Sequence, residues 1–344
     1  MQMDTTAVTG PLFLGVDLGG TNIKAGVVDD SGTSLSVARV PTEADRGCET
    51  GLINICCAVD EALEDADLTI DDVTGIGLAT PGTMDIPAGM LLEPPNLPGW
   101  DYFPIRDRLA AHFDKQTVLQ NDGNAAAYGE YWVGAGREVK SLVLWTLGTG
   151  VGGGIIINNN IIRGEHSHGA ECGHVIVEMD NGRPCGTGQR GTLEAYAGAN
   201  ALIQRCREAL DAGRESILAL EIAGGAELTP LLIAQAAEEG DQLADELIME
   251  TARYMGVGTT TIMHVIDPDM ILFGGAMTFG RDETELGRRF LQRIRDEVRQ
   301  RAFPVSYENT TIDYATLGGD AGYIGAAGYA RLKFSDRRDA PPAR

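Results

Sequence analysis

The stretch that decides the fold of this chain lies near its N-terminus, at residues 12–30, and reads LFLGVDLGGTNIKAGVVDD. Residues 12–17 form an apolar run of strand length, and the sequence LGGT at residues 18–21 supplies a glycine turn. A second apolar run follows at residues 23–28 and ends in the polar sequence DDSG. A strand, a glycine turn, a second strand and a polar turn are typical of a β-hairpin. The sequence therefore predicts a pair of adjacent strands at the start of the fold.

The same pattern returns about 130 residues later in the chain. Residues 142–147 (LVLWTL) are a strand candidate, residues 148–150 (GTG) form the turn, and residues 155–157 (III) form the return strand before a polar turn. Two similar turns at similar places favour an internal duplication of a core motif, with independent origin as the alternative.

Helix and strand patterns alternate through the rest of the chain. We expect helices at residues 48–65, 105–113, 124–132, 199–212, 229–240, 242–265 and 286–301, and strands at residues 73–79, 117–120 and 270–273. Alternating strands and helices with hairpins among them indicate an α/β fold with mixed β-sheets. Because 344 residues exceed the size at which one hydrophobic core stops growing, we expect two domains or lobes.

Composition and charge exclude several classes of protein. The chain is 43% hydrophobic and 22% charged, which is typical of a soluble globular enzyme. Its net charge of −23 argues against nucleic acid and anionic membranes as partners, since both need clustered positive charge. There is no apolar run of membrane-spanning length, and residues 1–10 lack the pattern of a signal peptide. Six scattered cysteines show no disulfide framework, so we expect a cytoplasmic protein.

Three glycine turns each follow a predicted strand, at Gly19-Gly20, at residues 148–154 and at Gly274-Gly275. Glycine lets backbone N–H groups approach an anion, and such backbone nests bind phosphate. The turns therefore predict a nucleotide held between two lobes. Residues 148–153 also match the G-x-G-x-x-G dinucleotide fingerprint, but that motif must open a helix, and the β-branched run at 155–157 is a poor helix start.

An acidic residue, Asp122, follows the predicted strand at 117–120 and precedes an alanine-rich helix. Open α/β sheets place their sites at the carboxyl ends of strands, so Asp122 is a candidate general base. Phosphoryl transfer needs such a carboxylate to accept the proton of the attacking hydroxyl. The alternative is that Asp122 or Asn124 only caps the helix.

Polar side chains among glycines supply candidate sugar ligands. Glu171 and His174 lie in the sequence GAECGH at residues 169–174, and Glu194 follows later. Carboxylates and histidine accept hydrogen bonds from hydroxyl groups. Glu194 alternatively is an acid at a helix N-terminus, where it would be stabilised by the helix dipole.

Together these motifs resemble the ROK family (repressor, open reading frame, kinase) of bacterial sugar kinases. The segments that carry the resemblance are DLGGTN at 17–22, TPG at 80–82, NLPGW at 96–100, Asn121-Asp122, LGTGVGGG at 147–154, E-x-GH at 171–174, Leu193-Glu194, FGG at 273–275 and LGGDAG at 317–322. Their order and spacing match over about residues 12–330. The resemblance implies the two-lobed actin-like ATPase (ribonuclease H-like) fold with a cleft between the lobes. It places residues 1–120 and about 318–344, including a C-terminal helix packed back on that lobe, in the small N-terminal lobe, and residues 121–317 in the large lobe.

The resemblance also implies roles for individual residues. Asp122 is the expected base, and Mg²⁺ of MgATP is oriented by Asp17. The hydroxyl-binding residues are Asn121, Glu171, His174 and Glu194, with Gly82 and Asn96 completing the pocket from the first lobe. The phosphates are lined by Gly19, Gly20, Thr21, Gly148, Thr149 and Gly150, and the adenosine is flanked by Gly274 and Gly275. A solvated strand lysine is the favoured interpretation of Lys24, and a phosphate ligand is the alternative.

One departure from the family concerns zinc. Many members bind a structural zinc through a Gly-His followed by C-x-C-G-x-x-G-C, whereas this chain reads CGTGQRGT at residues 185–192. Thr187 and Thr192 stand at two of the cysteine positions, and two remaining ligands cannot build a closed tetrahedral site. We therefore expect no structural zinc and a loop held by packing and hydrogen bonds. A substitute set drawn from His166, His168 and Cys172 is the alternative.

The function implied is that of an ATP-dependent hexose kinase in glycolysis, with glucose as the favoured acceptor and ADP and glucose 6-phosphate as products. Another hexose or an N-acetylhexosamine, and a sugar-binding protein without activity, are the alternatives. A sugar-sensing repressor would carry a DNA-binding segment before the first glycine turn, for which we expect no room, and its charge would be wrong for DNA. We expect a homodimer or homotetramer.

Overall fold

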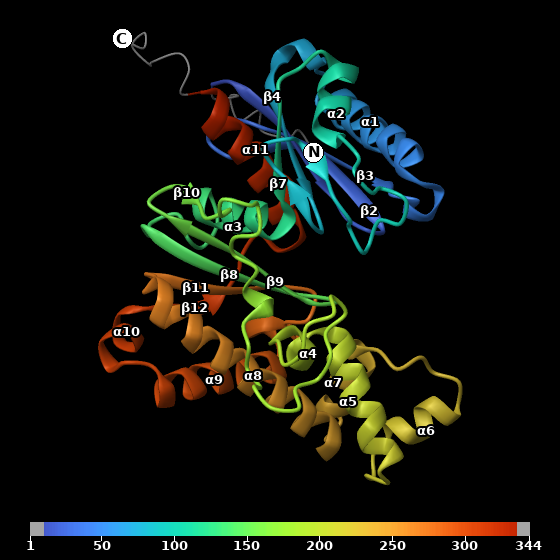
Figure 1. The fold of residues 1–344 in the computed structure, drawn as a ribbon, viewed down its shortest axis with the longest axis vertical. Coiled ribbons are helices and arrows are strands. Elements are labelled where there is room, and N and C mark those ends of the chain that lie inside the picture. The colour runs from blue at the N-terminus through green and yellow to red at the C-terminus, as the bar shows by residue number, and fades with distance from the viewer. Residues whose placement is uncertain (1–9, 336–344) are drawn as a thin grey trace, which may run out of the picture. The chain divides into compact units, whose positions relative to one another are not determined.

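The computed structural model describes residues 10–335, which divide into two compact units (Figure 1). Of these residues, the first unit comprises 10–138, 154–170 and 317–335, and the second comprises Val139–Gly153 and Glu171–Thr316. The lobe boundaries expected near residues 120 and 317 stay a prediction. The expectation that residues 1–10 lack a signal peptide concerns residues of which 1–9 lie outside the described range.

The first unit contains a five-stranded sheet with the order β3-β2-β1-β4-β7. Its strands are β1 (Leu12–Leu18), β2 (Asn22–Val28), β3 (Ser34–Pro41), β4 (Val73–Thr80) and β7 (Thr117–Asn121). The hairpin predicted at the start of the chain is confirmed, because β1 and β2 pair antiparallel with Phe13 opposite Val28. β4 pairs parallel with both β1 and β7, so the sheet is mixed.

A second five-stranded sheet repeats this arrangement, with the order β10-β9-β8-β11-β12. Its strands are β8 (Ser141–Leu147), β9 (Val151–Ile157), β10 (Asn160–Ile161), β11 (Met270–Gly275) and β12 (Thr311–Tyr314). In both sheets, three strands that follow one another in the chain lie side by side, and two later strands extend the sheet by parallel pairing. This shared arrangement matches the duplication expected from the two glycine turns. The turn after β8 opens into a strand and not a helix, so the dinucleotide motif is excluded.

Two helices of the first unit begin and end at the residues that the sequence pattern predicts, and a third, α3 (Asp122–Trp132), begins two residues before its predicted start. Helix α1 (Cys48–Asp65) buries Leu52, Ile55, Val59 and Leu63, which recur at helical spacing. The short helix α2 (Ile105–Phe113) buries Ile105 and Leu109 in the same way. Two short strands, β5 (Met84–Asp85) and β6 (Met90–Leu91), form a small hairpin between them.

The C-terminal helix α11 (Ala321–Phe334) belongs to the first unit, as the family resemblance implies. It packs against β1, β4 and α3 (Asp122–Trp132) through glycines that leave no room for a side chain. A Cβ added at Gly325 would lie 1.7 Å from the backbone oxygen of Ala125 in α3, and one at Gly15 would lie 1.8 Å from that of Tyr323. Gly325 of α11 and Gly15 of β1 are therefore required by backbone-to-backbone contact.

The second unit is covered by helices that the sequence predicted in part. They are α4 (Glu194–Ala197), α5 (Ala199–Asp211), α6 (Leu218–Ala223), α7 (Pro230–Glu238), α8 (Gln242–Ile266), α9 (Glu285–Arg301) and α10 (Pro304–Asn309). The sequence missed α6 and α10, since these six-residue helices are too short to show a period. Within residues 10–335, no helix combines the length and the apolar character that crossing a bilayer requires.

All six cysteines are free. Cys56 and Cys172 are buried, whereas the neighbouring Cys57 is exposed.

Candidate active site

The first glycine turn is held in place by a residue that the sequence did not single out, Thr42. The Gly19 N–H donates to the Asn22 oxygen at 3.0 Å and closes the turn. The buried Thr42 then donates its hydroxyl to the Gly19 oxygen (2.7 Å) and its N–H to the Thr21 oxygen (2.9 Å). Thr42, the first residue after β3, thus fixes the turn that is expected to line the phosphates.

Asp17 lies near the end of β1, directly opposite Lys24 of β2. Burial raises the pKa of the Asp17 carboxyl to about 6, and the positive charge of Lys24 partly opposes this rise. Lys24 itself donates to the Gly319 oxygen at 2.7 Å and pairs with Asp320 at 2.9 Å. The interpretation of Lys24 as a solvated strand lysine is therefore wrong, because it connects β2 to the residues before α11.

Gly82 and Asn96 lie in turns of the first unit, as expected. Gly82 has a positive φ of 85°, and a Cβ there would lie 2.8 Å from the Cα of Pro94. A Cβ on Gly20 would lie 3.4 Å from the Asn96 oxygen, so the structure brings the first glycine turn and Asn96 together. Glycine is required at position 82 both by its conformation and by the close approach of Pro94.

Asp122 is the first residue of α3, immediately after β7. The helix cap is Asn121, whose side-chain oxygen accepts the Asn124 N–H at 3.1 Å. The alternative that Asp122 or Asn124 is the cap is therefore wrong. The Asp122 carboxylate accepts the Gly123 N–H at 2.8 Å, and the positive end of the helix dipole stabilises its charge.

The second glycine turn, between β8 and β9, is held by the start of α5 and by the end of β11. The Gly148 N–H donates to the Gly150 oxygen, and the Gly148 oxygen accepts the Ala199 N–H, both at 3.0 Å. Gly275 pairs with Leu147, and a Cβ at Gly275 would lie 2.3 Å from the Leu147 oxygen. The structure thus brings the expected phosphate turn of the second unit next to the glycines expected to flank adenosine.

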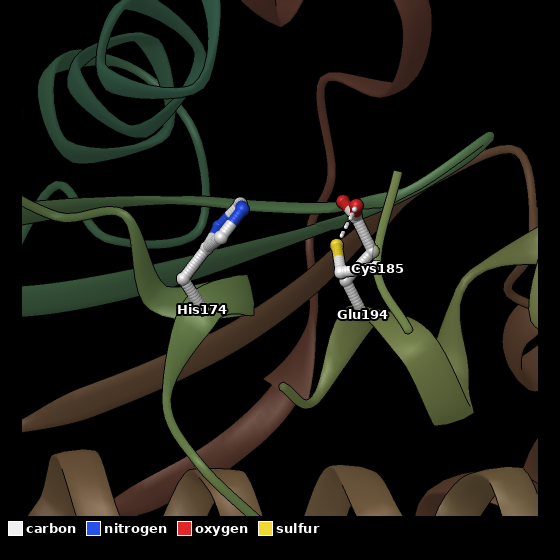
Figure 2. A group of neighbouring side chains, drawn as sticks. All are labelled: His174, Cys185 and Glu194. Atoms are coloured by element: carbon white, nitrogen blue, oxygen red, sulfur yellow. Dashed lines mark hydrogen bonds between the residues drawn. The ribbon is translucent and has the colours of Figure 1, made fainter. Parts of the chain in front are cut away.

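Glu194 begins α4, yet both hydrogen-bond partners of its carboxylate come from outside that helix. Its Oε2 atom accepts the Val151 N–H at 3.0 Å, and its Oε1 atom accepts a hydrogen bond from the Cys185 thiol at 3.1 Å (Figure 2). A Cβ on Gly150 would lie 2.0 Å from Oε2, so the carboxylate occupies the space that glycine leaves open. Glu194 therefore connects the second glycine turn to the loop at 175–192. The alternative that it acts only as an acid at the helix N-terminus is incomplete, because its carboxylate has these two partners.

His174 lies in a short 3₁₀ helix, Cys172–His174, that follows Glu171. Its Nε2 atom is 3.0 Å from the Thr187 hydroxyl, and its Nδ1 atom is 3.9 Å from the Glu171 carboxylate. Within this helix, a Cβ on Gly173 would lie 1.8 Å from the Val151 oxygen. Gly173, which precedes His174, and the carboxylate of Glu194 thus both lie against Val151 of β9.

Within residues 10–335, one group of three histidine, cysteine or acidic side chains could hold a metal ion. It consists of His174, Cys185 and Glu194, whose ligand atoms lie within 4.8 Å of one another (Figure 2). The substitute ligands His166, His168 and Cys172 are not part of it.

These residues do not fit a closed four-ligand zinc site. Threonine replaces two cysteine ligands, and the Thr187 hydroxyl is hydrogen-bonded to both His174 Nε2 and Cys185 Sγ. Burial raises the pKa of the Cys172 thiol to about 12, which disfavours the thiolate that a metal needs.

Comparison with known proteins decides the family. Residues 13–332 match the sequence model of the ROK family. The chain belongs to the ROK family. It is 34% identical over 313 residues to a protein named glucokinase from Halalkalibacterium halodurans, covering 91% of this chain and 93% of that protein.

Solved ROK structures share the fold. A ROK family glucokinase from Streptomyces griseus, in complex with glucose and AMPPNP, superposes with a TM-score of 0.77 at 35% identity and covers 93% of this chain and 99% of its own. A ROK hexokinase from Thermus thermophilus gives a TM-score of 0.74 at 32% identity, with 94% and 99% covered. The chain therefore has the mixed α/β, two-lobed actin-like ATPase fold of the ROK kinases.

Proposed function

We propose that this ROK protein is an ATP-dependent glucokinase, which transfers the γ-phosphoryl group of ATP to the 6-hydroxyl of glucose. The observation that carries the proposal is the Asp122 carboxylate at the N-terminus of α3, directly after β7. A carboxylate there can accept the proton of an attacking hydroxyl. The names of similar ROK proteins, glucokinase and hexokinase, support the same class of reaction.

Asp122 takes the hydroxyl proton as the oxygen attacks the γ-phosphorus in line with the leaving ADP oxygen. Sugar hydroxyls are held by Asn121, Glu171, His174 and Glu194, together with Gly82 and Asn96. His174 Nδ1 is buried and has no hydrogen-bond partner within the described residues, and it lies 3.9 Å from a carboxylate oxygen of Glu171. A sugar hydroxyl can donate to either of these acceptors, which is the chemistry that sugar binding requires.

The nucleotide enters as MgATP. Its phosphates lie along the turns at Gly19, Gly20, Thr21 and at Gly148, Thr149, Gly150, and its adenosine lies beside Gly274 and Gly275. The magnesium of this substrate neutralises charge on the transferred group. Asp17 fits a role beside it, because a buried carboxyl with a raised pKa gains from a nearby cation.

The sugar preference rests on the relatives. The Streptomyces griseus structure is a complex with glucose and AMPPNP, and this supports glucose over mannose, fructose or an N-acetylhexosamine as the acceptor here. We propose further that the enzyme acts in the cytoplasm, as a homodimer or homotetramer, and that the lobe boundaries lie near residues 120 and 317.

The proposal is tested by a coupled assay of ADP production against a panel of hexoses and N-acetylhexosamines, with and without Mg²⁺. Asp122→Asn and Asp122→Ala should lower kcat by about 10²- to 10⁴-fold, because proton transfer by a placed side chain contributes that much. Glucose binding, measured by calorimetry, should remain detectable in both variants. The matched control is Asp101→Asn, which changes an exposed aspartate and should leave kcat within twofold. Near-normal turnover of the Asp122 variants would remove Asp122 from the mechanism.

A further inference from the structure

The loop at residues 175–192 is ordered without the four ligands of the family's zinc pattern. Its backbone forms isolated bridges between Ile176 and Thr192 and between Pro184 and Arg190. The Arg183 N–H donates to the hydroxyl of Tyr196 at 2.9 Å, and the Arg183 guanidinium is paired with Glu208. The loop is thus fastened to α4 and α5 by groups that have nothing to do with a metal.

At the centre of this loop a chain of hydrogen bonds takes the place of metal–ligand bonds. It runs from His174 Nε2 to Thr187 Oγ1 (3.0 Å), from Thr187 Oγ1 to Cys185 Sγ (3.3 Å), and from Cys185 Sγ to Glu194 Oε1 (3.1 Å). We refer to these four residues as the Cys185 chain. Cys185 is buried, so its thiol has little access to water and its hydrogen bond to the carboxylate is not in competition with solvent.

The chain sets the hydrogen-bonding state of His174. The Thr187 hydroxyl has one proton, which it donates either to Cys185 Sγ or to the nearby Gln189 side chain. When the hydroxyl donates in either of these directions it accepts from His174, and the tautomer with the proton on Nε2 leaves Nδ1 as an acceptor. Nδ1 is the buried atom that has no partner within residues 10–335.

The chain also holds Glu194. Its two carboxylate oxygens have different hydrogen-bond partners. Oε2 accepts the Val151 N–H of the second glycine turn, and Oε1 accepts a hydrogen bond from the Cys185 thiol. Removing the thiol would leave the carboxylate free to turn about its Val151 bond. Among residues 10–335, Cys185 and the glycine turn therefore fix the direction in which Glu194 offers its remaining lone pairs.

We propose that Cys185 is a positioning residue for sugar binding, which together with Thr187 replaces a structural zinc in holding Glu194 and His174. The inference rests on the proposed function, because it takes Glu194 and His174 as sugar ligands. It goes beyond that function in assigning a role to the thiol and in making sugar recognition independent of zinc.

Steady-state kinetics of three cysteine variants test the positioning role. Cys185→Ala should raise the KM for glucose about three- to tenfold, the effect of losing one hydrogen bond of ordinary strength, because a thiol is a weak donor. The KM for ATP should change less than twofold. Cys185→Ser, which keeps a donor, should recover most of the glucose affinity, whereas loss of packing alone would not be recovered by a polar residue. The matched control Cys56→Ala removes a buried thiol elsewhere and should leave both KM values within twofold.

A variant of the carboxylate separates failure of this inference from failure of the proposed function. If Glu194→Gln raises the KM for glucose and Cys185→Ala does not, the positioning role of Cys185 is refuted while the sugar site stands. If Glu194→Gln leaves the KM for glucose unchanged, the assignment of Glu194 as a sugar ligand fails and the positioning role of Cys185 fails with it, whereas the proposed function is still decided by the Asp122 variants. Should Cys185→Ala not fold, Thr187→Val breaks the same chain and should raise the same KM.

Metal analysis tests the replacement of zinc. The protein purified from zinc-supplemented medium should contain less than about 0.1 zinc per chain, and treatment with a chelator should leave the KM for glucose unchanged, since a structural site needs four suitable ligands. The double variant Thr187→Cys, Thr192→Cys should bind one zinc per chain; the Thr192 hydroxyl is buried and has no partner among the described residues, so its replacement breaks no bond. One zinc per chain in the unaltered protein, or no uptake by the double variant, would overturn the inference.

Discussion

Replacing Asp17 by asparagine should stabilise the ligand-free protein while impairing the enzyme. Burial raises the pKa of the Asp17 carboxyl from 3.8 to about 6, despite the opposing charge of Lys24. The folded state therefore binds this proton more tightly than the unfolded state does. Between pH 3.8 and about 6 the free energy of unfolding must fall as the pH rises. Above pH 6 the full loss of stability caused by burying the ionised carboxylate remains.

The size of this cost follows from the shift. A difference of about 2 pH units corresponds to about 3 kcal/mol, at about 1.36 kcal/mol per unit. Asp17 as a whole is only partly buried, so solvent reduces this value, and we expect Asp17→Asn to gain about 1–2 kcal/mol at pH 7.5. The gain should shrink to about half at pH 5 and vanish near pH 4, where the aspartate is neutral in the folded state.

Urea unfolding at pH 7.5, 5 and 4, in the absence of Mg²⁺ and ATP, measures the gain. The exposed Asp101→Asn serves as the control and should leave the free energy of unfolding within about 0.5 kcal/mol of the parent. In the coupled assay Asp17→Asn should lower turnover by orders of magnitude, because the charge that it removes is the one expected to act beside MgATP. An Asp17→Asn protein that is less stable than the parent at pH 7.5, or whose gain is the same at all three pH values, would refute this reasoning.

Two glycine substitutions test the contacts that organise the site and the fold. Gly150→Ala places a Cβ 2.0 Å from Glu194 Oε2, so the carboxylate must leave the Val151 N–H. Because Gly150 does not have a positive φ, the variant should still fold. Its KM for glucose should rise about tenfold or more. An unchanged KM would mean that this carboxylate position is not used for sugar binding. Gly325→Ala forces a Cβ against the Ala125 backbone in the contact of α11 with α3, and urea unfolding should show a loss of about 3 kcal/mol or more. Gly186→Ala, where a Cβ meets nothing within 4 Å, is the control and should unfold like the parent.

Several elements could be predicted because their signal is local. The apolar spacing of α1 and α2 and the apolar runs of β1 and β8 lie within one element each, and the structure confirms them with shifts of at most a residue or two. The start of β9 was missed, because Val151 and the three glycines that follow it carry no strand signal by themselves. Their strand conformation comes from pairing within the second sheet.

In the candidate active site, too, local features could be predicted from the sequence, whereas contacts between distant residues could not. Asp122 could be predicted as a strand-end acid, but whether it or Asn121 capped the helix depended on side-chain directions that spacing does not contain. Lys24 was misjudged because its partners, Gly319 and Asp320, lie almost 300 residues away in sequence. The thiol of Cys185 could be recognised only as the remainder of an incomplete zinc pattern.

Short-range periodicity and the order of motifs were enough to predict the α/β class and the repeated strand–turn–strand unit. They were also enough to find the types of residue that a sugar kinase needs. Only the tertiary structure decided how the carboxylate of Glu194 is held, since its partners Val151 and Cys185 come from separate segments of the second unit. Hydrogen bonds act over about 3 Å in space and carry no trace in the spacing of residues along the chain.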